Sequence, residues 1–207
     1  MSDAAAPANS PTPAGAPAAD AGPRDPVTAH AARLVQAKVP GAVVEVVETG
    51  RHPFLRITAE HLVAACLVLR DDPELALDCC HLVSAVDWLG KTPADGPGSI
   101  EVVYHLVSYA KKTSAAYRRS AVKNDGFVVL RVRVPRDKPE VPSVMGVWVG
   151  ADWHEREMWD LMGVKFTDRP LLRRILLPED WPGHPLRKDW AYPVEYHGIP
   201  IIPPEGR

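Results

Sequence analysis

The sequence has few cysteines, no long apolar run and no marked excess of charge of either sign. Its three cysteines among 207 residues show no CxxC spacing, so neither a disulfide framework nor an iron–sulfur cluster held by this chain alone is expected. Apolar runs such as 62–69 are far too short to span a bilayer. A formal net charge of -2 gives no general attraction to nucleic acid or to anionic lipid.

The chain also lacks a basic stretch followed by an apolar one near its start, so no secretory signal is expected. We therefore expect a cytoplasmic protein whose membrane association, if any, comes through a partner. The cysteines Cys66, Cys79 and Cys80 are interpreted as small apolar residues of a core.

Motifs for catalysis or ligand binding are missing as well. His154-Glu155 resembles the start of a zinc-protease helix, but Met158 stands where that motif needs its second histidine. No glycine-rich phosphate loop or nucleophile elbow occurs. The adjacent acids Glu179 and Asp180 are more typical of capping or ion-pair groups than of an acid/base pair. We therefore predict no catalytic, cofactor-binding or metal-binding residue.

Composition divides the chain into three parts. Residues 1–26 hold six prolines and almost no large apolar residue, which predicts a disordered Ala/Pro-rich tail. Residues 27–135 form the predicted core, in which periodicity indicates helices and strands. We expect helices over 27–38 and 60–70, and strands over 43–47, 54–58, 75–87, 100–110 and 127–134.

The element order α-β-β-α-β-β-β predicts an α+β domain of two layers, a mixed sheet with helices on one face. In the last strand, alternate residues from Val128 to Val134 are expected to face the core, with Arg131 and Arg133 facing outward. Residues 111–124, rich in Lys and Arg, are interpreted as a hairpin arm or a loop.

Residues 136–207 are predicted to form a linker, a short helix and an extended partner-binding arm. Asp152 is expected to cap a helix over 152–162, and Gly163 suits its left-handed end. Prolines recur after Leu177, so this arm can be neither helix nor central strand, and its apolar residues need a surface that covers them.

Glu155 is the most informative acid of the predicted helix. On a helical projection it lies on the apolar arc, where a carboxylate is costly unless it is paired. We predict that Glu155 is buried and bonded to a backbone amide or an arginine, with Arg173 or Arg174 as first candidates. The opposite side of this helix carries Arg156, Glu157 and Asp160.

Residues 152–190 combine both signs of charge with most of the tryptophans, because five of the six Trp lie in or beside them. Trp and Arg supply buried area and directional hydrogen bonds together, as interface cores require. The pair Arg173-Arg174, flanked by leucines, is interpreted as an anchor for a partner. This stretch therefore indicates a contact surface for other macromolecules.

A long ordered string in this stretch resembles a known family. ERE (155–157), DLMG (160–163), LRRILLP (172–178) and GHPLRKD (183–189) are similar to the signature of the 30-kDa subunit, or C chain, of respiratory complex I, NADH-quinone oxidoreductase. VVYHLVSYAKK (102–112) and VRVPRDKPEVPSV (132–144) fit the same family. The resemblance covers about residues 27–190. Arg169 and Trp190 depart from its usual His and Tyr, and residues 111–125 are longer than its usual turn.

The resemblance implies a non-catalytic structural subunit of the peripheral arm, on the cytoplasmic side of the bacterial inner membrane. The complex uses FMN, iron–sulfur clusters, NADH and quinone, and this chain would bind none of them. Its partners would be the 49-kDa-type subunit of the quinone site and the iron–sulfur subunits. The expected partner-interface residues are Glu155, Arg156, Glu157, Asp160, Arg173, Arg174, Trp181, His184, Arg187, Lys188 and Asp189.

Three alternatives stay open. The first is the equivalent subunit of a membrane-bound hydrogenase or another relative of complex I. The second is an independent soluble enzyme, which would need a convergent polar pocket. The third is a nucleic-acid binder that uses the cationic residues between Lys111 and Arg136, although aromatic residues are sparse there and the net charge is slightly acidic.

Overall fold

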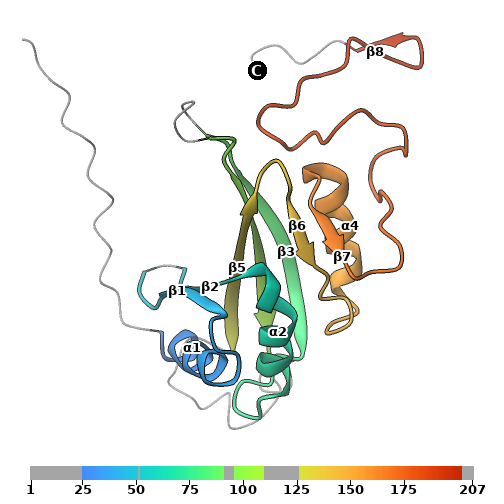
Figure 1. Ribbon diagram of the computed structural model, residues 1–207. Coiled ribbons are helices and arrows are strands. Elements are labelled where there is room, and N and C mark those ends of the chain that lie inside the picture. Colours follow the sequence, from blue (N-terminus) through green and yellow to red (C-terminus); the bar gives the residue numbers. More distant parts are fainter. Residues whose placement is uncertain (1–24, 51, 91–95, 110–125, 202–207) are drawn as a thin grey trace, which may run out of the picture.

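A five-stranded mixed sheet forms one layer of the protein (Figure 1). The computed structural model describes residues 25–50, 52–90, 96–109 and 126–201. The strand order is β1-β2-β5-β4-β3, in which only β2 and β5 pair in parallel among these neighbours. The strands are β1 (Val43–Val47), β2 (Phe54–Ile57), β3 (Cys79–Trp88), β4 (Ser99–Val107) and β5 (Phe127–Pro135). The predicted mixed sheet is confirmed.

Helices supply the second layer and share one core with one face of the sheet. They are α1 (Pro26–Lys38), α2 (Leu62–Asp71), which follows the 3-10 turn η1 (Ala59–His61), and α4 (Ala151–Met162). Fully buried residues of the sheet, such as Leu55, Tyr104 and Leu130, belong to the same apolar cluster as the inner residues of these helices. The predicted α+β fold with helices on one face is therefore confirmed.

The alternation predicted for the last strand is also confirmed. Val128, Leu130 and Val132 are fully buried, whereas Arg131 and Arg133 lie on the opposite face. On that face both guanidinium groups reach the carboxylate of Glu101 on β4. The outer face of the sheet is thus charged, and the inner face is apolar.

Several predicted boundaries are wrong. The strand expected over 75–87 begins only at Cys79, because the Asp72 side chain accepts the backbone N–H groups of Glu74 and Leu75 and holds a turn there. The strand expected over 100–110 ends at Val107. The predicted cap is also wrong, since Gly150 occupies the N-cap position of α4 and Asp152 lies inside the helix.

Two short strands connect α4 to the core. β6 (Glu140–Pro142) pairs in parallel with β7 (Lys165–Thr167), and α4 lies between them in the chain. Val141, Trp148 and Phe166 from this part are buried in the same apolar cluster as the sheet. The segment between β5 and β7 therefore packs as part of the folded core, beyond the limit of 135 that composition indicates.

Residues 168–201, called the strap below, run past α4 and loop over the end of the sheet at which β3 ends (Figure 1). The strap contains only the two-residue strands β8 (Glu195–Tyr196) and β9 (Ile199–Pro200). The predicted tail up to residue 24 and the cationic segment 111–124 lie outside the described residues. Within the described ranges, no helix is both long enough and apolar enough to cross a membrane.

Candidate functional site

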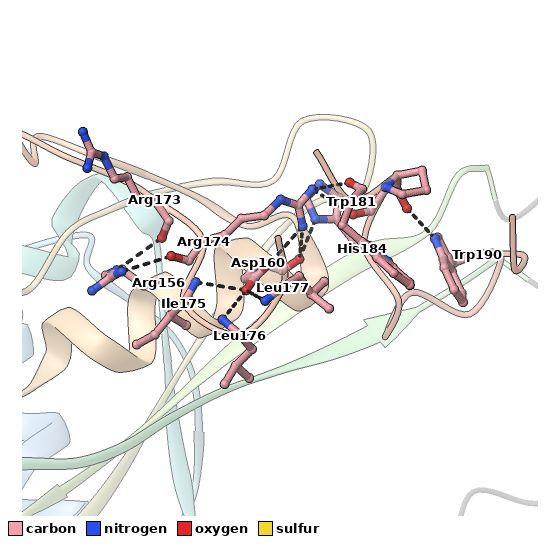
Figure 2. A network of polar contacts seen from close by, with 12 residues as sticks. Arg156, Asp160, Arg173, Arg174, Ile175, Leu176, Leu177, Trp181, His184 and Trp190 are labelled. Carbon is pink, nitrogen blue, oxygen red and sulfur yellow. Dashed lines mark hydrogen bonds and ion pairs between the residues drawn. The ribbon is translucent and has the colours of Figure 1, made fainter. Parts of the chain in front are cut away.

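A single carboxylate near the end of α4 organises the first part of the strap (Figure 2). Asp160 Oδ2 accepts the backbone N–H groups of Ile175, Leu176 and Leu177 at 3.0, 2.7 and 2.9 Å. Its Oδ1 accepts from Arg174 Nη1 at 2.8 Å. Asp160 is fully buried, so these bonds compensate the loss of water around its charge. We call this arrangement the first clasp.

Arg174 extends the first clasp across the strap. Its Nη2 donates to the carbonyls of Trp181 and Gly183 at 3.0 and 3.1 Å, so one guanidinium ties two turns of the strap to the end of α4. Nearby, Arg187 Nε donates to the carbonyl of Met162 at 2.8 Å. The bond from Arg187 satisfies a carbonyl group that the end of α4 leaves without an intrahelical partner.

Gly163 allows the strap to approach this closely. It ends α4 with φ 69°, the left-handed conformation that glycine adopts without steric cost. A Cβ at this position would lie 2.5 Å from the His184 ring and 2.9 Å from the Arg187 guanidinium. The predicted left-handed end is confirmed, and the structure adds a second reason for glycine there.

The hydrogen bonds of the first clasp favour the charged form of its acid. Burial alone raises the pKa of the Asp160 carboxyl, but the backbone donors at Leu177, Leu176 and Ile175 and the Arg174 side chain together hold that pKa below its ordinary value. Burial also lowers the pKa of His184, whose Nδ1 lies 3.0 Å from the Asp160 carbonyl oxygen. At neutral pH the clasp therefore joins a carboxylate to one guanidinium and a neutral imidazole.

A second clasp ties the strap to the sheet. Arg136, just after β5, donates to both oxygens of Asp87 on β3 at 2.7 and 3.0 Å and to Asp189 Oδ2 at 3.0 Å. Asp87 Oδ2 also accepts the backbone N–H of Lys188 at 2.9 Å. Burial raises the pKa of Asp87, but the bonds from Arg136 and Lys188 outweigh it and leave that pKa lowered. The Arg136 hydrogen bond likewise lowers the pKa of Asp189.

Glu155 occupies a buried site one turn before the first clasp. It is fully buried, as predicted, and accepts from the Val144 backbone N–H at 2.8 Å and from the Ser143 hydroxyl at 2.6 Å. The arginine partner is Arg169, at 3.0 Å, and the expectation of Arg173 or Arg174 is wrong. Burial raises the pKa of the Glu155 carboxyl, and the hydrogen bonds and the Arg169 charge oppose that rise.

The helical projection puts Asp160 on the side of α4 opposite the apolar arc, and the structure shows that the strap covers this side and buries Asp160 completely. A helical projection of one segment cannot show that a distant segment of the chain, here the strap, packs over its polar side.

The expected interface residues separate into two groups in the structure. Most of their polar atoms bond within the chain: Asp160, Arg174, His184 and Arg187 at the first clasp, Lys188 and Asp189 at the second, Glu155 with Arg169, and Arg156 with two strap carbonyls. The Trp181 ring lies 4.9 Å from that of Tyr196. Glu157 is half-buried and Arg173 is exposed. Their assignment as partner contacts stays a prediction.

The apolar side chains of the strap are the exposed part. Leu171, Leu176 and Leu186 are 54%, 63% and 57% exposed, and Ile199 is 68% exposed. Arg174, Arg187 and Asp189 of this segment are thus bonded inside the chain, while Leu171, Leu176 and Leu186 face solvent. Such an arrangement is typical of a preformed contact surface.

Sequence reasoning did not predict the partners of the second clasp or the role of Arg169. Asp87 and Asp189 are 102 positions apart, so no local spacing links them. The one available signal was the charged residue at the end of an otherwise apolar strand, which indicates a buried ion pair.

The fold and the strap together define a class: a two-layer α+β domain followed by a C-terminal strap with exposed apolar side chains. Residues 55–196 match the model of a protein family described as "Respiratory-chain NADH dehydrogenase, 30 Kd subunit". The C subunit of NADH-quinone oxidoreductase from Roseiflexus sp. (strain RS-1) is 39% identical over 75% of this chain and 79% of that protein. The C subunit of the same enzyme from Acidothermus cellulolyticus is 41% identical over 78% and 76%. The chain therefore belongs to the family of the 30-kDa subunit of respiratory-chain NADH dehydrogenase.

A solved structure shares the fold. A chain of the membrane-bound sulfane sulfur reductase, an archaeal respiratory membrane complex, matches with a TM-score of 0.55 at 24% identity. The match covers 79% of this chain and 85% of that one. This likeness shows a common fold between the two chains.

Proposed function

We propose that this chain is a non-catalytic structural subunit of the peripheral arm of a proton-pumping NADH-quinone oxidoreductase. The observation that carries the proposal is the strap, in which Arg174 and Asp189 are bonded within the chain while Leu171, Leu176 and Leu186 are exposed. Family membership supplies the complex in which such a surface would be covered.

Neighbouring subunits of that complex are the proposed cover. We expect contacts chiefly with the 49-kDa-type subunit of the quinone site and with the iron–sulfur subunits. The clasps preorganise the strap before assembly, so less conformational entropy is lost when a neighbour binds. A rigid strap would keep the subunits around it in fixed positions.

The flavin, clusters, NADH and quinone of the complex are proposed to lie on other subunits. We propose a peripheral position on the cytoplasmic side of the bacterial inner membrane, reached only through the complex.

Affinity purification of the tagged chain from mild detergent tests this proposal. The expected result is co-elution with flavin- and cluster-carrying subunits, with the visible absorption of both cofactors, and with NADH:quinone activity. Elution of the chain alone from membranes that retain this activity would overturn the proposal.

The same experiment distinguishes a subunit of NADH-quinone oxidoreductase from the equivalent subunit of a related complex. The likeness to the sulfane sulfur reductase chain is compatible with that alternative, whereas relatives near 40% identity are named as the C subunit of NADH-quinone oxidoreductase. Co-elution with a nickel–iron subunit and no flavoprotein would favour the alternative.

A further inference from the structure

An open pocket of about 440 Å³ lies between α4 and the first residues of the strap. Val149 and Leu171 contribute apolar surface to it, and Asp152, Arg156, Arg169 and Arg173 contribute charge. The pocket lies beside the first clasp, and its Arg156 side chain donates to the carbonyls of Arg173 and Arg174 at 3.2 and 3.0 Å. It is therefore built by the docking of the strap on α4.

The charges of this pocket are not balanced within the chain. Arg169 is neutralised, because its buried guanidinium pairs with Glu155 and Asp152. Arg156 donates only to carbonyl oxygens, which carry no net charge. The Arg173 side chain is exposed and points away from the Asp160 network (Figure 2), and it forms no ion pair with a described residue. Neither Arg156 nor Arg173 has an ion-pair partner among the described residues, and three arginines against Asp152 and Glu155 leave the pocket with one positive charge in excess.

Apolar surface surrounds these cations. Val149 is 83% exposed and Leu171 is 54% exposed at the pocket itself. Trp153, the residue after the pocket residue Asp152, is 69% exposed. Trp and Arg are the residue types that dominate binding energy at protein interfaces. Their cost in solvent suggests that another molecule covers them in the assembled state.

We propose that this pocket binds a segment of a neighbouring protein subunit that inserts an apolar side chain next to a carboxylate. The apolar side chain would contact Val149 and Leu171, and the carboxylate would pair with Arg173 and Arg156. A guanidinium binds a carboxylate through two parallel hydrogen bonds, which fixes orientation as well as charge. The inference rests on the proposed function, because it names the chemistry of one partner contact.

Charge reversal at the unpaired arginine is the first test. Arg173→Glu should lower the yield of co-purified subunits about tenfold, because it places two acids against each other. Arg173→Lys should give an intermediate yield, since the positive charge remains but the two parallel hydrogen bonds are lost. Arg33→Glu is the matched control, because Arg33 is exposed on α1, a different helix. An unchanged yield with Arg173→Glu would overturn the inference.

A photoreactive residue in place of Leu171 identifies the occupant within the intact, purified complex. The expected product is a cross-link to one subunit, at a peptide that carries Asp or Glu within about two positions of an apolar residue. Replacing that acid with Arg should restore the yield of the Arg173→Glu variant. A cross-link to lipid only, to a peptide without an acid, or to no molecule in an intact complex would overturn the inference.

Failure of the proposed function and failure of the pocket proposal can be told apart by experiment. Wild-type co-purification alone decides whether the host complex is an NADH-quinone oxidoreductase. The cross-linked peptide and the charge swap decide the pocket, whichever complex is isolated.

Discussion

The sheet core and the strap bury opposite kinds of side chain. In the core, Leu130, Tyr104 and Leu55 are fully buried, and the charges of the sheet lie on its outer face. In the strap, charged groups meet buried carboxylates such as Asp160, while Leu176 and Leu186 are more than half exposed. The core is stabilised by removal of apolar surface from water, and the strap is positioned by charge-assisted hydrogen bonds.

This difference separates stability from assembly. Directional bonds at two clasps can define the path of a segment that has almost no regular secondary structure. The apolar side chains of that segment are then free to contact another chain. Substitutions in the core should therefore change the free energy of unfolding. Substitutions in the strap should instead change its protection from proteolysis and hydrogen exchange, and its assembly with other chains.

The largest effect is expected from the core. Leu130→Ala removes a fully buried side chain from the central part of the sheet and should lower the free energy of unfolding by about 2–5 kcal/mol. Urea unfolding of the purified chain measures it. Leu176→Ala is the control and should change that free energy by less than about 0.5 kcal/mol, because Leu176 is 63% exposed. Equal losses in the two variants would contradict the comparison.

A smaller loss is expected at the buried acid that joins the two regions. In Glu155→Gln, one amide nitrogen must face a donor, since both oxygens of Glu155 accept from Val144, Ser143 and Arg169. Relief from burying a charge offsets part of this cost, and a net loss of about 1–3 kcal/mol is expected. Glu157→Gln on the same helix, half-buried in the structure, serves as the control. Identical urea midpoints for the two variants would argue against this role.

A local effect is expected at the first clasp. Asp160→Asn removes the negative charge that accepts four donors, and the strap should open about tenfold more often, equivalent to roughly 1.4 kcal/mol. Limited trypsin digestion measures it as faster cleavage in the strap, while global unfolding changes less. Glu179→Gln, at an exposed acid of the same segment, should leave cleavage unchanged. Equally fast cleavage of the strap in the control variant would show that the effect is not specific to the bonds of Asp160.

The smallest effect is expected from acidification, which should weaken the strap before it weakens the sheet. The pKa values of Asp160, Asp87 and Asp189 are lowered in the folded chain, so their contribution is complete above the ordinary Asp pKa of about 3.9 and is lost as pH falls through the lowered values. Hydrogen exchange, corrected for its intrinsic pH dependence, should show the strap amides at 175–177 losing protection below about pH 4 before those of β4. Simultaneous loss in both regions would contradict separate stabilisation.

Local sequence patterns predicted the core well because its determinants are local. Alternation in β5 and the glycine at the end of α4 each depend on neighbouring residues, and both are confirmed. The start of β3 was not predicted, because the Asp72 side chain holds a turn in a sequence that is otherwise strand-like.

The clasps could be predicted only in part, because their pairs are distant in the sequence. Burial of Glu155 follows from its place on an apolar arc, but the choice of Arg169 over Arg173 depends on the path of the strap. Burial of Asp160 depends on the same path. Family resemblance placed Asp160, Arg174 and Asp189 among the expected interface residues, but not Arg136, Asp87 or Arg169.

Accessibility of the strap leucines in the assembled complex tests the central claim most directly. Single Leu176→Cys and Leu186→Cys variants in a Cys79→Ser background can be labelled with a maleimide, because Cys66 and Cys80 are buried. Both cysteines should react readily in the isolated chain and at least about tenfold more slowly in the purified complex, where a neighbouring subunit excludes solvent. Equal rates in the free chain and in the complex would show that no neighbouring protein covers the strap.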